Sequence, residues 1–456
     1  MPDRPAVKML GLWTLTALVV GNMIGSGVFL LPAALAPFGG ASLLGWLVTA
    51  AGSILIGLVF ARLARRVPSA GGPYAFTREA FGEFAGFLVG WGYWISCWSA
   101  IAAIAVAMVG YLGEFVPGLA TRPAPAAAAA IGTIILLTAI NVRGVREAGI
   151  VQLVTTVLKI LPLVAVAVFG FSRFEAANFV PFNPTGDPLW LAVQGCLALT
   201  LWAFLGLEAA TVPAGEVSEP RVTIPRATML GIGIAAALYI AATTAVMGMV
   251  PRESLATSTA PFATAAQILW GPWAGDLVAA GATISCFGAL NGWILVAARL
   301  PMAIAADGLF PQLFARLSSR GTPAIGLVLS SALACLLVVS NFSKNLVALF
   351  TGIILLSTLA SLIPFVFCAM ADLMLAVRAR QAGAAEPLAT TATLAILAFV
   401  YGLVATAGSG QSTVFWGFLT LLCGIPVYVL VRWRRAAPGS TQELRRSSPR
   451  QRRGFE

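Results

Sequence analysis

Apolar runs of about 20 residues recur along the whole chain and are separated by short polar segments. An α-helix of that length crosses the hydrocarbon core of a bilayer. One or two such runs could be buried core helices of a soluble domain, but a series along the whole chain predicts a membrane protein. The twelve predicted spans lie near residues 12–35, 41–63, 83–112, 124–141, 149–171, 188–215, 227–250, 272–304, 323–341, 344–374, 388–407 and 413–433.

Composition supports the same class. Of 456 residues, 59% are hydrophobic and 10% are charged, whereas soluble domains carry about 25% charged residues. The six cysteines all fall in apolar spans and are interpreted as small hydrophobic residues. The chain has no histidine, which excludes His-dependent catalysis and His zinc sites. We therefore expect neither an enzyme nor a bound metal or cofactor.

The distribution of Lys and Arg predicts the orientation. With twelve spans both termini share one side, and that side also carries most of the basic loop residues. Only Arg122, Arg173, Arg252 and Lys344 fall on the other side. Because basic loops stay cytoplasmic during insertion, both termini are predicted to be cytoplasmic. The net charge of +11 then reflects topology and contact with anionic lipids, and no nucleic-acid partner is expected.

Two predicted spans are interrupted at mid-membrane. The first contains Gly21, Asn22, Gly25, Ser26 and Gly27, and the sixth contains Gly206 and Glu208. These spans open two successive five-helix blocks, and paired glycine interruptions at corresponding places are typical of transporter substrate sites. The alternative is that the glycines only permit close helix packing; two breaks in corresponding spans favour the site.

Backbone chemistry explains what such a site would bind. Non-helical backbone in lipid leaves unpaired N–H and C=O groups unless it lines a cavity. Free amides near Ser26 and Gly27 suit a carboxylate, and free carbonyls before Gly206 suit an ammonium group. Together the two breaks are predicted to hold the backbone of an amino acid.

Four segments resemble motifs of the amino acid–polyamine–organocation superfamily: Gly21–Phe29, Pro68–Tyr74, Thr200–Glu208 and Ala306–Pro311. The similarity covers nearly the whole chain. It is closest to the basic amino acid/polyamine antiporters, especially those of the arginine/agmatine type. The resemblance implies an all-α membrane protein with a leucine-transporter-like 5+5 inverted repeat, discontinuous helices one and six, and alternating access, often as a homodimer.

The resemblance also implies site residues. Substrate contacts would come from Met23, Gly25, Ser26, Gly27, Ser96, Cys97, Ile101, Trp202, Leu205, Trp293 and Ser357. Gating or proton coupling would involve Tyr74, Tyr93, Lys159, Glu208 and Phe365. In this scheme Trp202 closes over the substrate, Trp293 belongs to a middle gate, and Tyr93 with Glu208 forms a deeper gate. Tyr74 would be a pH-responsive position.

Each of these roles has a plainer alternative. Tryptophans in spans mostly serve packing, and Tyr74 fits an interfacial anchor. Glu208 fits a structural hydrogen-bond acceptor, although buried charges in spans are usually functional. Lys159 is either a lysine that titrates during the cycle or a permanently charged group that binds carbonyls of the first span. Both alternatives for Lys159 predict the same location.

Three positions depart from the arginine/agmatine pattern. Ile101 replaces an Asn that the pattern ties to the guanidinium end of the substrate, Ser96 replaces Ala, and Phe365 replaces a gate Tyr. Isoleucine cannot hydrogen-bond a guanidinium group. The distal pocket is therefore predicted to prefer a shorter or less polar side chain.

The function predicted from the sequence is exchange of amino acids and/or their decarboxylated amines across a bacterial inner membrane. The alternative is proton-coupled uptake or exchange of neutral amino acids through Lys159, and a less favoured one is a non-transporting nutrient receptor. We expect one twelve-helix domain over residues 1–434, with repeats at about 10–171 and 188–374 and two further helices at about 388–433. Residues 435–456 are expected to form a disordered basic cytoplasmic tail.

Overall fold

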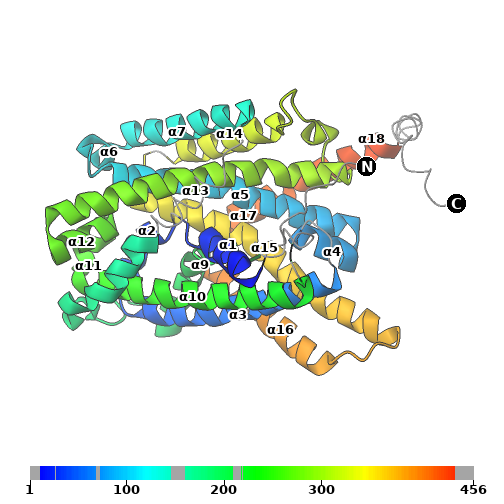
Figure 1. Ribbon diagram of the computed structural model, residues 1–456, viewed down its shortest axis with the longest axis horizontal. Helices are drawn as coiled ribbons and strands as arrows, with labels where there is room; N and C mark the ends of the chain where they lie inside the picture. Colours follow the sequence, from blue (N-terminus) through cyan, green and yellow to red (C-terminus); the bar gives the residue numbers. More distant parts are fainter. Residues whose placement is uncertain are drawn as a thin grey trace.

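The computed structural model describes residues 11–25, 27–67, 72–144, 160–208, 217, 219–341 and 343–436. Within these residues the regular elements are helices, and the longest of them run side by side along the long axis of the molecule (Figure 1). They are α1 (Leu12–Met23), α2 (Gly27–Leu35), η1 (Ala36–Phe38), α3 (Ala41–Arg66), α4 (Pro73–Phe81), α5 (Glu83–Leu112), α6 (Pro117–Thr121), α7 (Pro123–Arg143), η2 (Gly170–Arg173), η3 (Ala176–Phe179), α9 (Leu189–Trp202), α10 (Pro220–Met249), α11 (Arg252–Thr257), α12 (Pro261–Trp270), α13 (Pro272–Ala306), η6 (Gln312–Ala315), α14 (Ala324–Ser340), α15 (Leu346–Gln381), α16 (Leu388–Gly408), α17 (Gln411–Leu422) and α18 (Gly424–Ala436).

Many of these helices are built to cross a membrane. Among the described residues, eight helices are long and apolar enough to span it, and the bent pair Leu12–Met23 and Gly27–Phe38 makes a ninth candidate. Three shorter apolar helices cover Ile160–Arg173, Leu189–Trp202 and Ala324–Ser340. The predicted class, an all-helical protein with many membrane-crossing helices, is confirmed.

The helices pack in two groups. One group consists of α1, α3, α9 and α10, in which α3 packs against α9 and α10, and α10 packs against α1. The other consists of α5, α7, α13 and α14, which contact one another in the same way. Helix α15 bridges the groups, since it packs against both α5 and α9. Both broken segments of the sequence, at the ends of α1 and α9, therefore belong to the first group.

Burial distinguishes central helices from peripheral ones. In α5, 94% of the most apolar stretch is buried, against 33% in α7 and 17% in the segment Gln411–Arg435. Helix α5 therefore forms the centre of the molecule, while α7, α17 and α18 present apolar side chains outward. In a membrane protein such side chains face lipid tails, which do not penalise exposed hydrocarbon.

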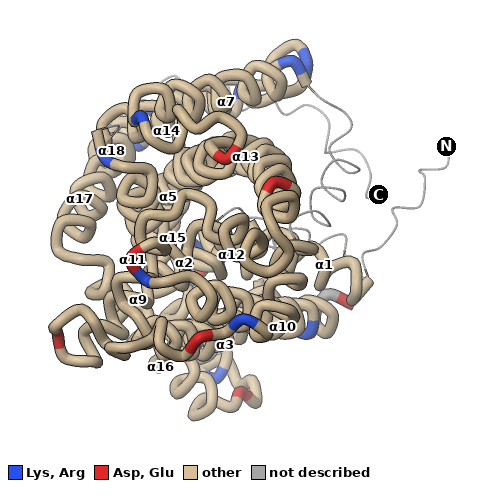
Figure 2. The backbone as a smooth tube through the Cα atoms, turned by 90° about the vertical axis from the view of Figure 1, so that its left-hand side faces the viewer, with Lys and Arg blue, Asp and Glu red and all other residues tan. Residues whose placement is uncertain are grey.

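The two ends of the helix assembly differ. Helices α4 and α18 lie at one end, and α6, α11 and α12 lie at the other (Figure 1). At the first end, Arg62 and Arg66 of α3 both bind Asp372 of α15, at 3.2 and 3.3 Å, and Arg66 also binds Glu386 at 2.8 Å. Figure 2 looks onto the second end, where charged segments are scattered.

Candidate substrate site

The first helix break separates α1 from α2. Helix α1 ends at Met23, Ile24 leaves helical geometry with ψ 75°, and the Gly25 N–H donates to the Met23 carbonyl at 2.7 Å. The segments Leu12–Met23 and Gly27–Phe38 make an angle of 47°. Because N–H groups in the first turn of a helix lack partners within the helix, α2 presents donors and a partial positive charge at this point. Ser26 lies outside the described residues.

The second break follows α9. The N–H groups of Ala203, Phe204 and Leu205 donate to carbonyls three residues earlier, so the helix tightens and stops. Gly206 then takes φ +101°, a left-handed conformation that glycine adopts without strain. Hydrogen bonds between described residues use neither the Ala203 nor the Leu205 carbonyl. Both residues line the cavity described below, so their carbonyl oxygens are candidate acceptors for an ammonium group.

The two breaks touch each other. A Cβ added to Gly206 would lie 3.2 Å from the Asn22 carbonyl oxygen, and a Cβ added to Gly27 would lie 1.8 Å from the Trp202 Nε1. The Trp202 indole therefore rests directly on the start of α2. Glycine is required at position 27 because any larger side chain would occupy the space of this ring.

A cavity lies at this junction. Its lining consists of Asn22, Met23, Gly25, Gly27, Val28, Ile104, Trp202, Ala203, Leu205 and Trp293. The volume is about 20 Å³, room for about one water molecule. Both tryptophans form part of its wall, and the space is too small for an amino acid.

Six predicted substrate residues line this cavity: Met23, Gly25, Gly27, Trp202, Leu205 and Trp293. Four lining residues were not predicted, namely Asn22, Val28, Ala203 and Ile104. Asn22 and Val28 lie inside the glycine-rich motif of the first span, and Ala203 directly follows Trp202. These three residues could therefore have been predicted from the motifs. Ile104 lies one helical turn after Ile101, and only the three-residue helical spacing pointed to it.

Four other predicted substrate residues lie outside the lining and are fully buried: Ser96, Cys97, Ile101 and Ser357. Ser96 and Ser357 join α5 to α15. The Ser357 hydroxyl donates to the Ser96 carbonyl at 2.9 Å, and the Ser96 hydroxyl contacts the Ser361 hydroxyl at 2.5 Å. Their contact with a substrate stays a prediction. Lys159 lies outside the described residues.

The carboxylate of Glu208 is buried beside the second break, with 2% of the residue exposed. The Tyr93 hydroxyl of α5 donates to Glu208 Oε1 at 2.5 Å, and the Gly206 N–H donates to Oε2 at 3.2 Å. Leu205, three residues earlier, lines the cavity. The predicted pairing of Tyr93 with Glu208 therefore exists, and it links the central helix α5 to the broken segment.

A second polar cluster closes the end that carries α4. The Tyr74 hydroxyl donates to Asp307 at 3.0 Å, and Arg78 forms an ion pair with the same carboxylate at 2.7 Å. Burial, followed by the negative charge of Asp307, raises the pKa of Tyr74 well above its ordinary value, although Arg78 opposes the shift. The phenol therefore stays protonated and acts as a donor that ties α4 to the end of α13.

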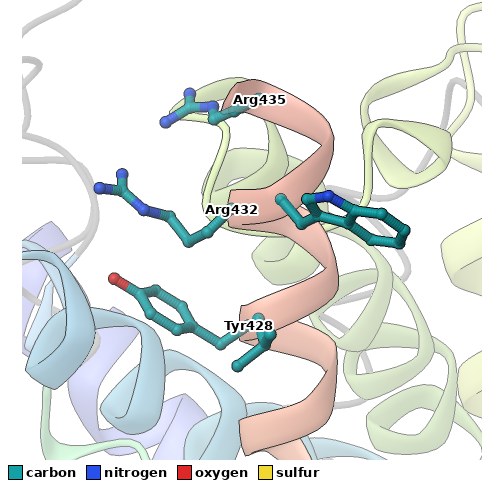
Figure 3. A pocket seen from close by; sticks show the side chains of 5 residues that line it. Tyr428, Arg432 and Arg435 are labelled. Carbon is teal, nitrogen blue, oxygen red and sulfur yellow. The ribbon is translucent and has the colours of Figure 1, made fainter. Parts of the chain in front are cut away.

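Helix α18 covers this cluster from the outside. Tyr428, Arg432 and Arg435 project from one side of α18 into a hollow (Figure 3). Arg435 donates to the Asp307 backbone carbonyl at 2.8 Å, and Arg432 forms an ion pair with Glu83 at 2.5 Å. The end of α13 is thus held both through the Asp307 side chain and through its carbonyl.

Phe365 stands where the family resemblance predicts a gate tyrosine. It is buried in α15, and its ring packs edge-on against Phe60 of α3 at a centroid separation of 5.6 Å. Phe60 in turn contacts Phe76 of α4 at 6.2 Å. At this position an aromatic stack replaces the hydrogen bond that a tyrosine would offer.

Comparison with known proteins identifies the family of the chain. The family model described as "Amino acid permease" matches residues 10–431. The chain belongs to this family. Among relatives of the permease chain, the cadaverine/lysine antiporter of Escherichia coli strain K12 is 37% identical over 363 residues, which cover 78% of this chain and 81% of the antiporter. The putrescine transporter PotE of Haemophilus influenzae is 32% identical over 426 residues, covering 93% and 97%. PotE of Escherichia coli strain K12 is 32% identical over 435 residues, covering 94% and 98%.

Proposed function

We propose that this permease exchanges a basic amino acid for a decarboxylated amine by alternating access, without acting as an enzyme. The observation that carries the proposal is the small cavity between two helix breaks, whose lining includes the start of α2 on one side and Ala203 and Leu205 on the other. This pairing of donors and acceptors matches the carboxylate and ammonium of an amino acid. Trp202 and Trp293 would move aside to admit it.

The buried carboxylate of Glu208 favours a substrate with positive charge. A carboxylate buried at mid-membrane is costly and is usually retained for a functional partner. The relatives named for cadaverine, lysine and putrescine point to substrates with an amine at the far end. We therefore rank lysine/cadaverine and ornithine/putrescine pairs first. Arginine/agmatine stays a candidate, although the apolar Ile101 offers no hydrogen bond to a guanidinium group.

The complete architecture is part of the same proposal. Each of the twelve predicted spans overlaps one of the eight long helices, the bent pair or the three shorter apolar helices. The two packing groups and the two breaks support the leucine-transporter-like 5+5 inverted repeat. We place both termini in the cytoplasm of a bacterium, the chain in its inner membrane, and the basic tail at the cytoplasmic face. Arg435 and Ala436, which were expected in this tail, belong to helix α18. A homodimer remains part of this expectation.

The test is counterflow in reconstituted vesicles. Vesicles preloaded with unlabelled cadaverine, putrescine or agmatine are diluted into labelled lysine, ornithine or arginine, and initial uptake is compared with that of empty vesicles. Exchange predicts uptake that depends on the preloaded amine, with the largest ratio identifying the natural pair. Equal uptake by empty and loaded vesicles would contradict exchange, and binding without any flux would instead indicate a nutrient receptor.

A second candidate is proton-coupled transport of neutral amino acids. It is favoured by the apolar cavity wall, to which Val28, Ile104 and Leu205 contribute. In that case a pH gradient alone should drive labelled neutral amino acids into empty vesicles, and Lys159→Ala should abolish the dependence on the gradient. Gradient-independent exchange in both wild type and variant would reject this candidate.

A further inference from the structure

A second cavity, which shares no lining residue with the substrate site, lies between the start of α7 and the loop that precedes α15. Its volume is about 220 Å³, and its lining consists of Leu119, Ala120, Thr121, Arg122, Pro123, Ala126, Ser343, Lys344, Asn345, Leu346 and Leu349. It lies at the end of the molecule that carries α6, opposite α4 and α18 (Figure 1). The proposed transport function does not use this cavity.

The cavity gathers positive charge. Arg122 and Lys344 come from segments more than 200 residues apart, and both line the same space, whereas its lining contains no acidic residue. Within the described part of the chain, neither residue forms an ion pair. By contrast, Arg252, another basic residue predicted for this end, contacts Glu253 at 3.7 Å.

Neutral donors surround the two cations. The Asn345 side-chain oxygen accepts from the Ala348 N–H at 2.8 Å, which caps α15 and leaves the Asn345 amide nitrogen as a donor. Ser343 adds a hydroxyl. Helices α7 and α15 both begin here, and their N-termini add partial positive charge of the same sign. The polar part of the lining therefore has the chemistry of an anion-binding site.

Apart from Thr121, the remaining lining is apolar, and exposed apolar side chains lie close to it in the sequence. Leu119, Leu346 and Leu349 contribute hydrocarbon to the cavity. Phe115 and Val116, directly before α6, are 47% and 48% exposed, as expected for apolar side chains at the boundary with lipid. A free inorganic anion would gain nothing from such an apolar wall, whereas an amphipathic anion would use both parts.

We propose that this cavity binds the phosphodiester group of an anionic phospholipid in the leaflet at the α6 end. Arg122 and Lys344 would contact the phosphate oxygens, Asn345 and Ser343 the polar head group, and the leucines the glycerol and upper acyl chain. The location accounts for basic residues at an end where membrane insertion otherwise disfavours them. The bound lipid would join α7 to the loop before α15.

The test uses the delipidated full-length chain in detergent, titrated with short-chain phosphatidylglycerol and followed by native mass spectrometry. The double variant Arg122→Ala/Lys344→Ala should bind about 30-fold more weakly, since each basic residue near an anionic lipid contributes about a fivefold effect. Arg122→Lys/Lys344→Arg and the control Arg252→Ala should bind within about twofold of wild type. Equal affinity of wild type and the double variant would overturn the proposal.

Two further measurements separate the sources of phosphate and guard against misfolding. Inorganic phosphate and short-chain phosphatidylcholine should each bind more weakly than phosphatidylglycerol. Inorganic phosphate binding as tightly as phosphatidylglycerol would overturn the assignment to a lipid. If the double variant does not elute as a single species, the single variants carry the test, with about fivefold weaker binding expected for each.

Discussion

The Tyr93 hydroxyl and the Glu208 carboxylate lie 2.5 Å apart, and this contact connects the central helix α5 with the segment that follows α9. Tyr93 belongs to the packing group of α5 and α13, whereas Glu208 follows the last helix turn of the other group. If the two groups move relative to each other during transport, this hydrogen bond must break or travel with one of them. It is therefore a sensitive place to alter exchange without altering the cavity lining.

Replacing Tyr93 with Phe should slow exchange by about 10- to 100-fold, because a hydrogen bond to a buried charged group contributes about 1.5–3 kcal/mol. Initial counterflow rates in vesicles measure this effect. The matched control is Tyr239→Phe, since the buried Tyr239 hydroxyl has no hydrogen-bond partner among the described residues. Equal losses in both variants would mean that removal of any buried hydroxyl slows exchange, against a specific role for the Tyr93–Glu208 contact.

Replacing Gly27 with Ala should abolish most exchange. The new methyl group would fall 1.8 Å from the Trp202 indole nitrogen, so the ring must leave its position, at a cost of about 1–3 kcal/mol. Gly132→Ala in α7 is the control, because no neighbouring atom lies within 4 Å of a Cβ there. The double variant Gly27→Ala/Trp202→Phe should recover part of the stability, measured as the melting temperature. No recovery would argue that Trp202 is not the obstructing group.

Replacing Asp372 with Asn should destabilise the fold by about 3 kcal/mol or more. The carboxylate has no exposed side-chain surface and serves both Arg62 and Arg66, so its loss leaves two guanidinium groups without their shared partner. Glu386→Gln should cost less than about 1 kcal/mol, because that carboxylate is 24% exposed. Thermal unfolding in detergent ranks the two variants. The reverse order would mean that Glu386, not Asp372, holds α3 in place.

Replacing Tyr74 with Phe should lower stability by the same amount from about pH 5.5 to about pH 8.5. Burial and Asp307 raise the pKa of the phenol above its ordinary value of about 10. A raised pKa means that the folded state favours the protonated form. The stabilisation is fully present below about pH 10 and is lost only as the pH rises through the raised pKa. Melting temperatures of wild type and variant should therefore run parallel between about pH 5.5 and about pH 8.5. A difference that changes across that range would show that Tyr74 responds to pH through a neighbouring group.

The sequence predicted the all-helical membrane class and the positions of both breaks, because long apolar runs and mid-membrane glycines follow from the cost of unpaired backbone in lipid. Through family resemblance it also predicted that Tyr93 pairs with Glu208, as observed, while their role as a gate stays a prediction. Asn22 and Ala203 lie within the two motifs, so the motifs could also have predicted that they line the cavity.

Contacts between distant helices were harder to predict. Ser96 and Ser357 are predicted to face the substrate, which stays a prediction, and in the structure their hydroxyls bind each other's helices. A serine in a span can satisfy its hydroxyl on a ligand or on a neighbouring backbone, and the sequence carries no preference between them. The hydrogen bond from Arg435 to the end of α13 joins residues 128 positions apart. No periodicity or local motif encodes that pairing.

The position of Arg435 has a practical consequence. Its guanidinium occupies the space that a side chain at position 308 would need, only 1.5 Å from an added Cβ, and Gly308 itself has φ +72°. The last turn of α18 is thereby fastened to the loop after α13. Affinity tags or fluorescent fusions should consequently be attached beyond Ala436. Removing Arg435 would remove the hydrogen bond that it donates to the Asp307 carbonyl at the end of α13.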